Sequence, residues 1–147
     1  MKDTLDAVLA DKGRGLHHVA PEATVLDAVG KMNQERIGAV LVCVSGELVG
    51  IFTERDVLCR VVAEGRDPAA TRVVDVMTPE VVAVRSTTLV EEAMAVVTER
   101  RFRHLPVIDD GELKGIVSSG DLTRQVSRHQ EGHIKDLVNF ITGKYPA

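Results

Sequence analysis

Residues 36–56 read RIGAVLVCVSGELVGIFTERD, and a shift of 65 positions places them on residues 101–121, RFRHLPVIDDGELKGIVSSGD, without an insertion. The two segments share an arginine, the triplet Gly-Glu-Leu, the pair Gly-Ile and a final aspartate. Upstream, TVLDAV at 24–29 is similar to TLVEEAM at 88–94 after a slip of one residue. The chain therefore contains an internal duplication, and we expect its two halves to share one fold.

The first half has the pattern of a β-α-β-β-α unit. A short extended piece at 15–20 precedes a helix that Thr24 caps, with apolar residues at helical spacing. GAVLVCV and ELVGIF are apolar, β-branched runs joined by Ser45-Gly46, which is typical of a two-residue hairpin. A second helix is expected over 54–65, with Gly65 as its stop. Its inward-facing residues are expected to be Val57, Leu58, Val61 and Val62.

The second half predicts the same order of elements. We expect an extended piece at 81–84, a helix over 88–100, strands around 104–109 and 112–117 that turn at Asp110-Gly111, and a long helix from Ser119. The apolar stripe of that helix is Leu122, Val126, Ile134, Leu137, Val138 and Ile141, and it runs to about Thr142 before Gly143 and Pro146. Such a stripe needs a covering surface, either the body of the same chain or a second subunit.

The halves define the domain organisation. Residues 1–66 form the first domain with its N-terminal segment, 67–80 the linker, and 81–147 the second domain with the C-terminal helix. A unit of about 60 residues exposes one sheet face and buries little apolar surface alone. We therefore expect an α/β (α+β) fold in which two pseudo-two-fold related units pack sheet to sheet and leave two equivalent clefts.

Composition limits the classes of function. The 147 residues carry a formal net charge of −4, which gives no overall attraction to nucleic acid or to anionic lipid. No apolar window approaches the roughly 18 residues of a membrane span, and the acidic start MKDTLDAVLA is unlike a signal peptide, so we expect a cytosolic protein. Cys43 and Cys59 lie in apolar runs and are expected to be reduced thiols. His129 and His133 lie one helical turn apart, but their polar surroundings indicate solvated surface and no metal site.

The repeated turns Thr53-Glu-Arg-Asp56 and Ser118-Ser-Gly-Asp121 allow two interpretations. In the first, hydroxyl and acid form a capping box at the start of a helix, although that box prefers the longer Glu or Gln and Asp is expected to fit it less well. In the second, the helix start binds an anion and the fixed carboxylate accepts both hydrogens of a ribose diol. The glycine before each turn would then let a ligand approach the backbone closely. The spacing by itself leaves both interpretations open.

The quoted repeats, together with DVMTPEVVAV at 75–84, resemble a tandem pair of CBS domains, the regulatory module first named for cystathionine β-synthase. The resemblance runs from about Leu16 to Leu122 and implies adenosine-containing ligands, such as AMP, ADP, ATP, NAD or S-adenosylmethionine, in the two clefts between the domains. It implies that an aspartate holds the ribose of each ligand while a hydroxyl lies near ribose or phosphate. The residues concerned are Asp56 with Thr53, and Asp121 with Ser118.

The halves diverge where the second has Arg103 and His104 and the first has Gly38 and Ala39. In related pairs basic residues at this position contact phosphate, so the resemblance implies that Arg103 contacts phosphate, with His104 as a weaker candidate. The alternative for Arg103 is a solvated charge at the strand edge, and the alternative for His104 is a half-buried imidazole with its hydrogen bonds satisfied. The remaining ligand-binding candidates are Arg55, Thr78 and the counterparts Gly38 and Ala39.

No Ser-His-Asp or Cys-His set stands at a recognisable spacing, so we expect a regulatory sensor and not an enzyme. The resemblance implies a flat two-fold homodimer that binds adenine nucleotides, requires no metal and passes the change to an unknown effector protein. The alternative is a structural or protein-interaction module whose clefts are vestigial.

Overall fold

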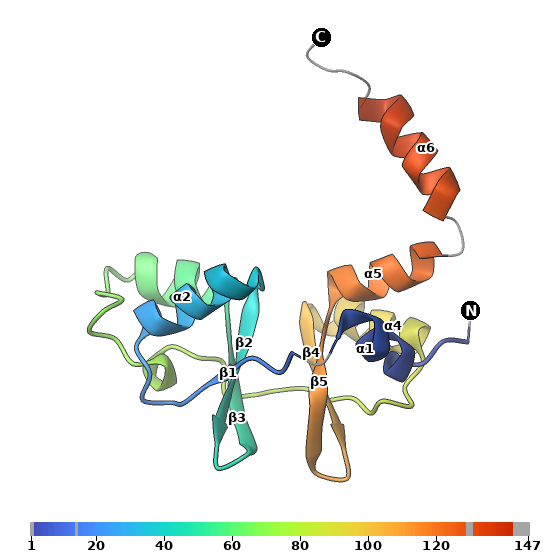
Figure 1. The fold of residues 1–147 in the computed structure, drawn as a ribbon. Helices are drawn as coiled ribbons and strands as arrows, with labels where there is room; N and C mark the ends of the chain where they lie inside the picture. The colour runs from blue at the N-terminus through green and yellow to red at the C-terminus, as the bar shows by residue number, and fades with distance from the viewer. Residues whose placement is uncertain (1, 14, 129–130, 143–147) are drawn as a thin grey trace.

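The structure, a computed structural model, describes residues 2–13, 15–128 and 131–142, with the side chains of 131–136 outside the described part. Two similar halves stand side by side, each with a β-hairpin at one end and helices gathered at the other (Figure 1). The mixed α and β architecture predicted from the sequence is confirmed.

The first half is a three-stranded sheet with the order β1-β2-β3 and helices beside it. Its elements are β1 (His18–Val19), α2 (Val25–Glu35), β2 (Ala39–Val44), β3 (Glu47–Thr53), α3 (Glu54–Asp56) and the π-helix η1 (Val57–Val62). The Thr24 hydroxyl accepts a hydrogen bond from the Asp27 backbone N–H at 3.1 Å and so caps α2 as predicted. Ser45 and Gly46 have φ of 50° and 81°, the left-handed pair that a tight hairpin turn requires.

The second half repeats this frame with one strand fewer. Its elements are α4 (Val90–Arg100), the antiparallel strands β4 (His104–Asp109) and β5 (Glu112–Ser118), α5 (Ser119–Ser127) and α6 (Glu131–Thr142). Val84 forms a parallel bridge with Val107, at the positions where Val19 pairs with Val42 in the first half. The shift of 65 residues therefore holds in strand register as well as in sequence.

The sheets pack against each other, as predicted. Along β2, Val40 and Val42 face the helices of the first half, whereas Leu41 faces the other half. Leu41 lies in a cluster with Ile51 of β3 and Ile116 of β5. Because both faces of β2 are covered, the strand is an almost continuous apolar run and does not alternate.

Two segments outside the hairpins complete the cores. The 3-10 helix η2 (Val73–Asp75) brings Val73 into the core of the first half. The helix α1 (Leu5–Lys12) precedes the first half in sequence but packs on the second, where Val8 is buried. Val8 and Val73 are themselves 65 positions apart, so α1 is the structural counterpart of the segment between the halves.

The helix predicted over 54–65 differs from the α-helical expectation. Hydrogen bonds from Ala63 N–H to the Leu58 carbonyl and from Arg66 N–H to the Val61 carbonyl span five residues, which makes the turn wider than that of an α-helix. Val61 is fully buried, but Leu58 and Val62 are 63% and 64% exposed, because the wider turn moves them off the inward face. The prediction that both face inward is wrong.

The long C-terminal helix is also interrupted. Its first part, α5, ends at Ser127, and α6 begins at Glu131 and projects away from the body (Figure 1). The sequence between Val126 and Ile134 carries no apolar residue, so no packed face supports a continuous helix there. The exposed apolar residues of α6 are Leu137, Val138, Phe140 and Ile141, so its stripe is not covered by the described part of the chain. Gly143, Pro146 and the side chains of Ile134 and His133, like His129, lie outside the described residues.

Candidate functional site

Both repeated turns form complete capping boxes. The Thr53 hydroxyl accepts from Asp56 N–H at 3.2 Å, and Asp56 Oδ2 accepts from Thr53 N–H at 3.0 Å. Ser118 and Asp121 make the same pair of bonds at 3.1 and 2.8 Å. The expectation that aspartate fits this box less well is wrong: the cap residue is extended, with ψ near 165° in both copies, and presents its N–H within reach of the shorter side chain.

Asp56 is almost fully buried at 6% exposure and has partners from two other elements. The Thr78 hydroxyl donates to its Oδ1 at 3.0 Å, and Arg60 Nε lies 3.8 Å from the same oxygen. The Arg60 guanidinium also donates to the Met77 carbonyl at 2.6 Å. The structure therefore brings the candidates Thr53, Asp56 and Thr78 together at the end of β3.

Asp121 has a different set of partners. Lys12 Nζ, at the end of α1, donates to Asp121 Oδ2 at 2.7 Å and to the Ile116 carbonyl at 2.8 Å. Arg124 lies 3.3 Å from the other carboxylate oxygen. Burial raises the pKa of Asp121, but the hydrogen bonds from Lys12 and Ser118 outweigh it, and the net pKa is lowered. Asp121 is therefore a carboxylate held by an ammonium group.

The two glycines that precede the repeated turns, Gly50 and Gly115, lie against other segments of the same chain. A Cβ on Gly50 would lie 2.6 Å from Met77 Sδ and 3.0 Å from the Thr78 carbonyl oxygen, because the segment between the halves crosses β3 there. A Cβ on Gly115 would lie 2.7 Å from Cδ2 of Leu9 in α1. These glycines admit a covering segment, which corrects the interpretation that they make room for a ligand.

Groups of the two halves lie close together at the start of β2 and β4. A Cβ on Gly38 would lie 2.8 Å from Oε1 of Glu54 and 3.6 Å from His104 Nε2, so the candidates Gly38 and His104 are neighbours across the domain boundary. Burial lowers the pKa of His104, and Lys12 lowers it further, against an opposing effect of Glu54. His104 is thus a neutral imidazole at neutral pH.

The remaining candidates are spread over surface and core. Arg103 and Arg55 are exposed, whereas Ala39 is buried between the sheets. The Arg103 carbonyl accepts from Ser119 N–H at 2.8 Å, just as the Gly38 carbonyl accepts from Glu54 N–H at 3.0 Å. This pair of bonds fixes the strand starts of the two halves at equivalent places beside the capped turns.

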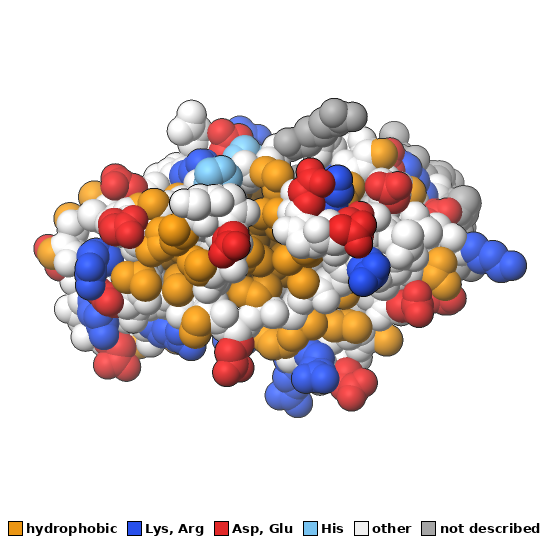
Figure 2. Space-filling view, turned by 90° about the horizontal axis from the view of Figure 1, so that it is seen from below, with side chains coloured by type: hydrophobic (Ala, Val, Ile, Leu, Met, Phe, Trp, Pro, Cys, Tyr) orange, Lys and Arg blue, Asp and Glu red, His pale blue; other side chains and the backbone are white. Residues whose placement is uncertain are grey.

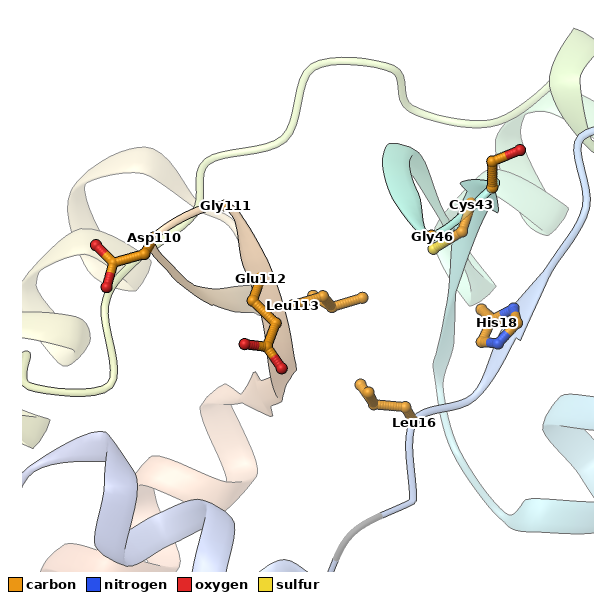
Figure 3. A pocket seen from close by; sticks show the side chains of 9 residues that line it. Leu16, His18, Cys43, Gly46, Asp110, Gly111, Glu112 and Leu113 are labelled. Carbon is orange, nitrogen blue, oxygen red and sulfur yellow. The ribbon is translucent and has the colours of Figure 1, made fainter.

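A cavity lies between the tips of the two hairpins. It has a volume of about 460 Å³, and Leu16 and Leu113 extend into it from opposite halves while His18 and Cys43 lie on the side of the first half (Figure 3). Seen from this end, the molecule shows apolar side chains across both halves (Figure 2). Burial raises the pKa of the Cys43 thiol. None of the ten candidate residues lines this cavity.

A smaller cavity of about 140 Å³ lies beside Asp121. Its lining residues are Val8, Asp11, Lys12, Asp121, Arg124, Gln125 and Arg128. Sequence reasoning missed Lys12, Arg60 and Arg124. The signal for Lys12 was present, because the shift of 65 places Lys12-Gly13 on Met77-Thr78.

Metal-binding clusters and membrane-spanning helices are absent from the part of the chain that the structure describes. Within residues 2–13, 15–128 and 131–142, no group of three or more His, Cys, Asp or Glu side chains is placed to hold a metal ion. Over the same ranges, every helix is too short or too polar to cross a bilayer.

Comparison with known proteins identifies the repeat. A sequence model of the CBS domain matches the chain twice, at residues 13–63 and 73–128. The chain is 37% identical over 151 residues to the CBS domain-containing protein CBSX3, mitochondrial, of Arabidopsis thaliana, covering 97% of this chain and 73% of the relative. It is 35% identical over 133 residues to the CBS domain-containing protein YhcV of Bacillus subtilis, covering 90% of this chain and 89% of the relative.

A solved structure agrees with these relatives. A protein with CBS domains from Burkholderia ambifaria is 40% identical, with a TM-score of 0.81, and the match covers 86% of this chain and 93% of that one. The compartment of the present chain stays a prediction, since the Arabidopsis relative is mitochondrial and cytosol was expected here.

Proposed function

The chain belongs to the CBS domain family, and we propose that it is a regulatory sensor that binds adenosine-containing nucleotides in the clefts between its two domains. One observation carries the proposal. Asp56 and Asp121 occupy equivalent strand-to-helix turns, and groups of the two halves, Gly38 and His104, meet between them.

The chemistry of these turns suits a ribose. A carboxylate has about four lone-pair positions, and the capping bond uses one of them. Asp56 Oδ1 accepts from the Thr78 hydroxyl, a group that can rotate and accept from a ligand hydroxyl in its turn. A ribose diol can therefore bind Asp56 without opening the helix cap. The exposed Arg103 guanidinium, at the start of the neighbouring β4, supplies a phosphate partner.

Ligand titrations test the proposal directly. We expect AMP, ADP, ATP or NAD to raise the melting temperature, GTP to leave it unchanged, and Asp56→Ala and Asp121→Ala each to remove one class of site in calorimetry. If no adenosine compound at millimolar concentration shifts the melting temperature or gives a calorimetric signal, the sensor proposal is refuted. The protein-interaction module with vestigial clefts then becomes the better account.

We also propose that the protein acts as a homodimer and passes its ligand state to an effector protein. The supporting observation is the exposed apolar stripe on α6, where Leu137 and Val138 are about half exposed and Phe140 is 86% exposed. Exposed apolar residues grouped on one helix are typical of an interaction surface. Light scattering on the full chain measures the oligomeric state, and a monomer at all concentrations would remove the dimer from the proposal.

A further inference from the structure

The two aspartates of the repeat are equivalent in sequence but differ in the charge of the group that covers them. Asp56 is covered by Thr78, a neutral hydroxyl at 3.0 Å. Asp121 is covered by Lys12, an ammonium group at 2.7 Å. Both covering groups come from the segment that precedes a domain, at adjacent places in the repeat, since Lys12 aligns with Met77 and Gly13 with Thr78. The two halves therefore share the capped turn but differ in the side chain that contacts its aspartate.

Lys12 is fixed in place by more than its partner carboxylate. Its ammonium also donates to the Ile116 carbonyl of β5 at 2.8 Å, and its side chain is 30% exposed, whereas that of Asp121 is 10% exposed. It is the last residue of α1, whose Leu5 is fully buried in the second domain. Lys12 and the Ser118 N–H occupy Oδ2, and Arg124 lies at Oδ1. None of these donors can accept a hydrogen bond in turn, so a ribose diol that binds both oxygens of Asp121 must displace the Lys12 ammonium.

Displacement has a different cost for different ligands. The diol of a nucleoside replaces the hydrogen bond that Asp121 loses, but the displaced Lys12 ammonium loses its hydrogen bond to a carboxylate. The other carboxylate of the small cavity, Asp11, already pairs with Arg128, and Arg124 also competes for Asp121. A neutral ribose leaves the charge of Asp121 unchanged, so the lining of the small cavity carries three cations, Lys12, Arg124 and Arg128, against two carboxylates, Asp11 and Asp121. A phosphate group supplies the negative charge that offsets this excess.

We propose that Lys12 makes the second cleft selective for phosphorylated adenosine compounds over neutral adenosine and over S-adenosylmethionine, which carries no phosphate and a net positive charge. The first cleft, covered by Thr78, has no such requirement. This inference rests on the proposed nucleotide binding and names the ligand charge that one of the two sites accepts.

The test measures two ligands on one variant. Asp56→Ala removes binding at the first cleft, so that only the second cleft is measured. In this background Lys12→Met should bind adenosine more tightly and AMP more weakly, each by roughly three- to tenfold. The opposite signs follow because Met removes both the competitor for Asp121 and the partner for phosphate. Lys114→Met is the matched control, since Lys114 is a lysine of the same domain paired with Glu112 at 3.3 Å, and it should change neither affinity.

Every outcome bears on the proposal. Equal changes for AMP and adenosine, or no change in either, would overturn the role of Lys12 while leaving nucleotide binding intact. Absence of binding by any adenosine compound to the unsubstituted chain would overturn the sensor proposal and this inference with it. If Asp56→Ala proves unstable, amide chemical shifts at Gly120 follow the second cleft in the otherwise unsubstituted chain, and the same opposite signs are required there.

Discussion

Asp56→Ala separates the two roles of the repeated aspartate. In the structure its carboxylate accepts from the Thr53 N–H at 3.0 Å and from the Thr78 hydroxyl at 3.0 Å, while the Arg60 contact at 3.8 Å involves a half-exposed guanidinium and contributes little. Losing two bonds to a buried charged acceptor, partly offset by water entering the space, should lower the free energy of unfolding by about 2–4 kcal/mol. For a chain of this size that is a fall in melting temperature of roughly 6–14 °C.

The amide Asp56→Asn supplies the control, because its carbonyl oxygen can still accept from the Thr53 N–H and keep the cap. We expect it to lose less than about 1.5 kcal/mol of stability while losing ribose binding almost as completely as the alanine variant. Urea denaturation gives the stabilities and calorimetry with AMP the affinities. An alanine variant as stable as the unsubstituted chain would refute the capping role, and an asparagine variant with full AMP affinity would refute the ribose role.

Four further results are expected. Gly50→Ala should lower the free energy of unfolding by about 1–3 kcal/mol in urea denaturation, because the Thr78 backbone carbonyl lies close to where the new Cβ would be. Gly115→Ala should lower it less, because the flexible end of Leu9 can rotate away, and equal losses would contradict this reasoning. The lowered pKa of His104 means that the unfolded chain binds more protons, so the free energy of unfolding should fall as pH drops through about 6.5, and less steeply in His104→Gln. Arg103→Ala should weaken AMP by about tenfold or more in calorimetry but adenosine little, with partial recovery in Arg103→Lys; equal losses would mean that Arg103 only shapes the cleft. Removal of the chain from Ser127 onward should shift light scattering toward monomer or aggregate, and an unchanged dimer would place the interface elsewhere.

Much of the frame could be predicted from the sequence because its signals are local. The Thr24 cap, the Ser45-Gly46 and Asp110-Gly111 turns and the two β-branched runs beside each turn all form as expected. Sheet-to-sheet packing followed from the same residues, since a strand that is apolar at every position must be covered on both faces. The cap, the turns and the hairpins depend on contacts between residues that are close in sequence.

The errors arise where helix geometry departs from the periodic pattern or where a contact joins distant segments. Leu58 and Val62 fit an α-helical stripe in sequence, but the π-helical turn of η1 leaves them outside. The break between α5 and α6 follows from the lack of an apolar face around residues 127–133, a deficit that an otherwise periodic stripe conceals. Lys12 was missed because its partner Asp121 is 109 residues away, and only the alignment of α1 with the segment between the halves brings them together.

The same architecture explains why the two clefts need not act alike. In each half, a glycine in the last strand admits a covering segment, and that segment places one side chain on the aspartate of the turn. Divergence of the covering segment changes the charge at the aspartate without disturbing the strand, the cap or the domain core. A duplicated module can therefore keep one folding frame and develop two ligand preferences. In this chain the difference is one hydroxyl, Thr78, against one ammonium, Lys12, and the affinities of the two clefts for adenosine and AMP should differ accordingly.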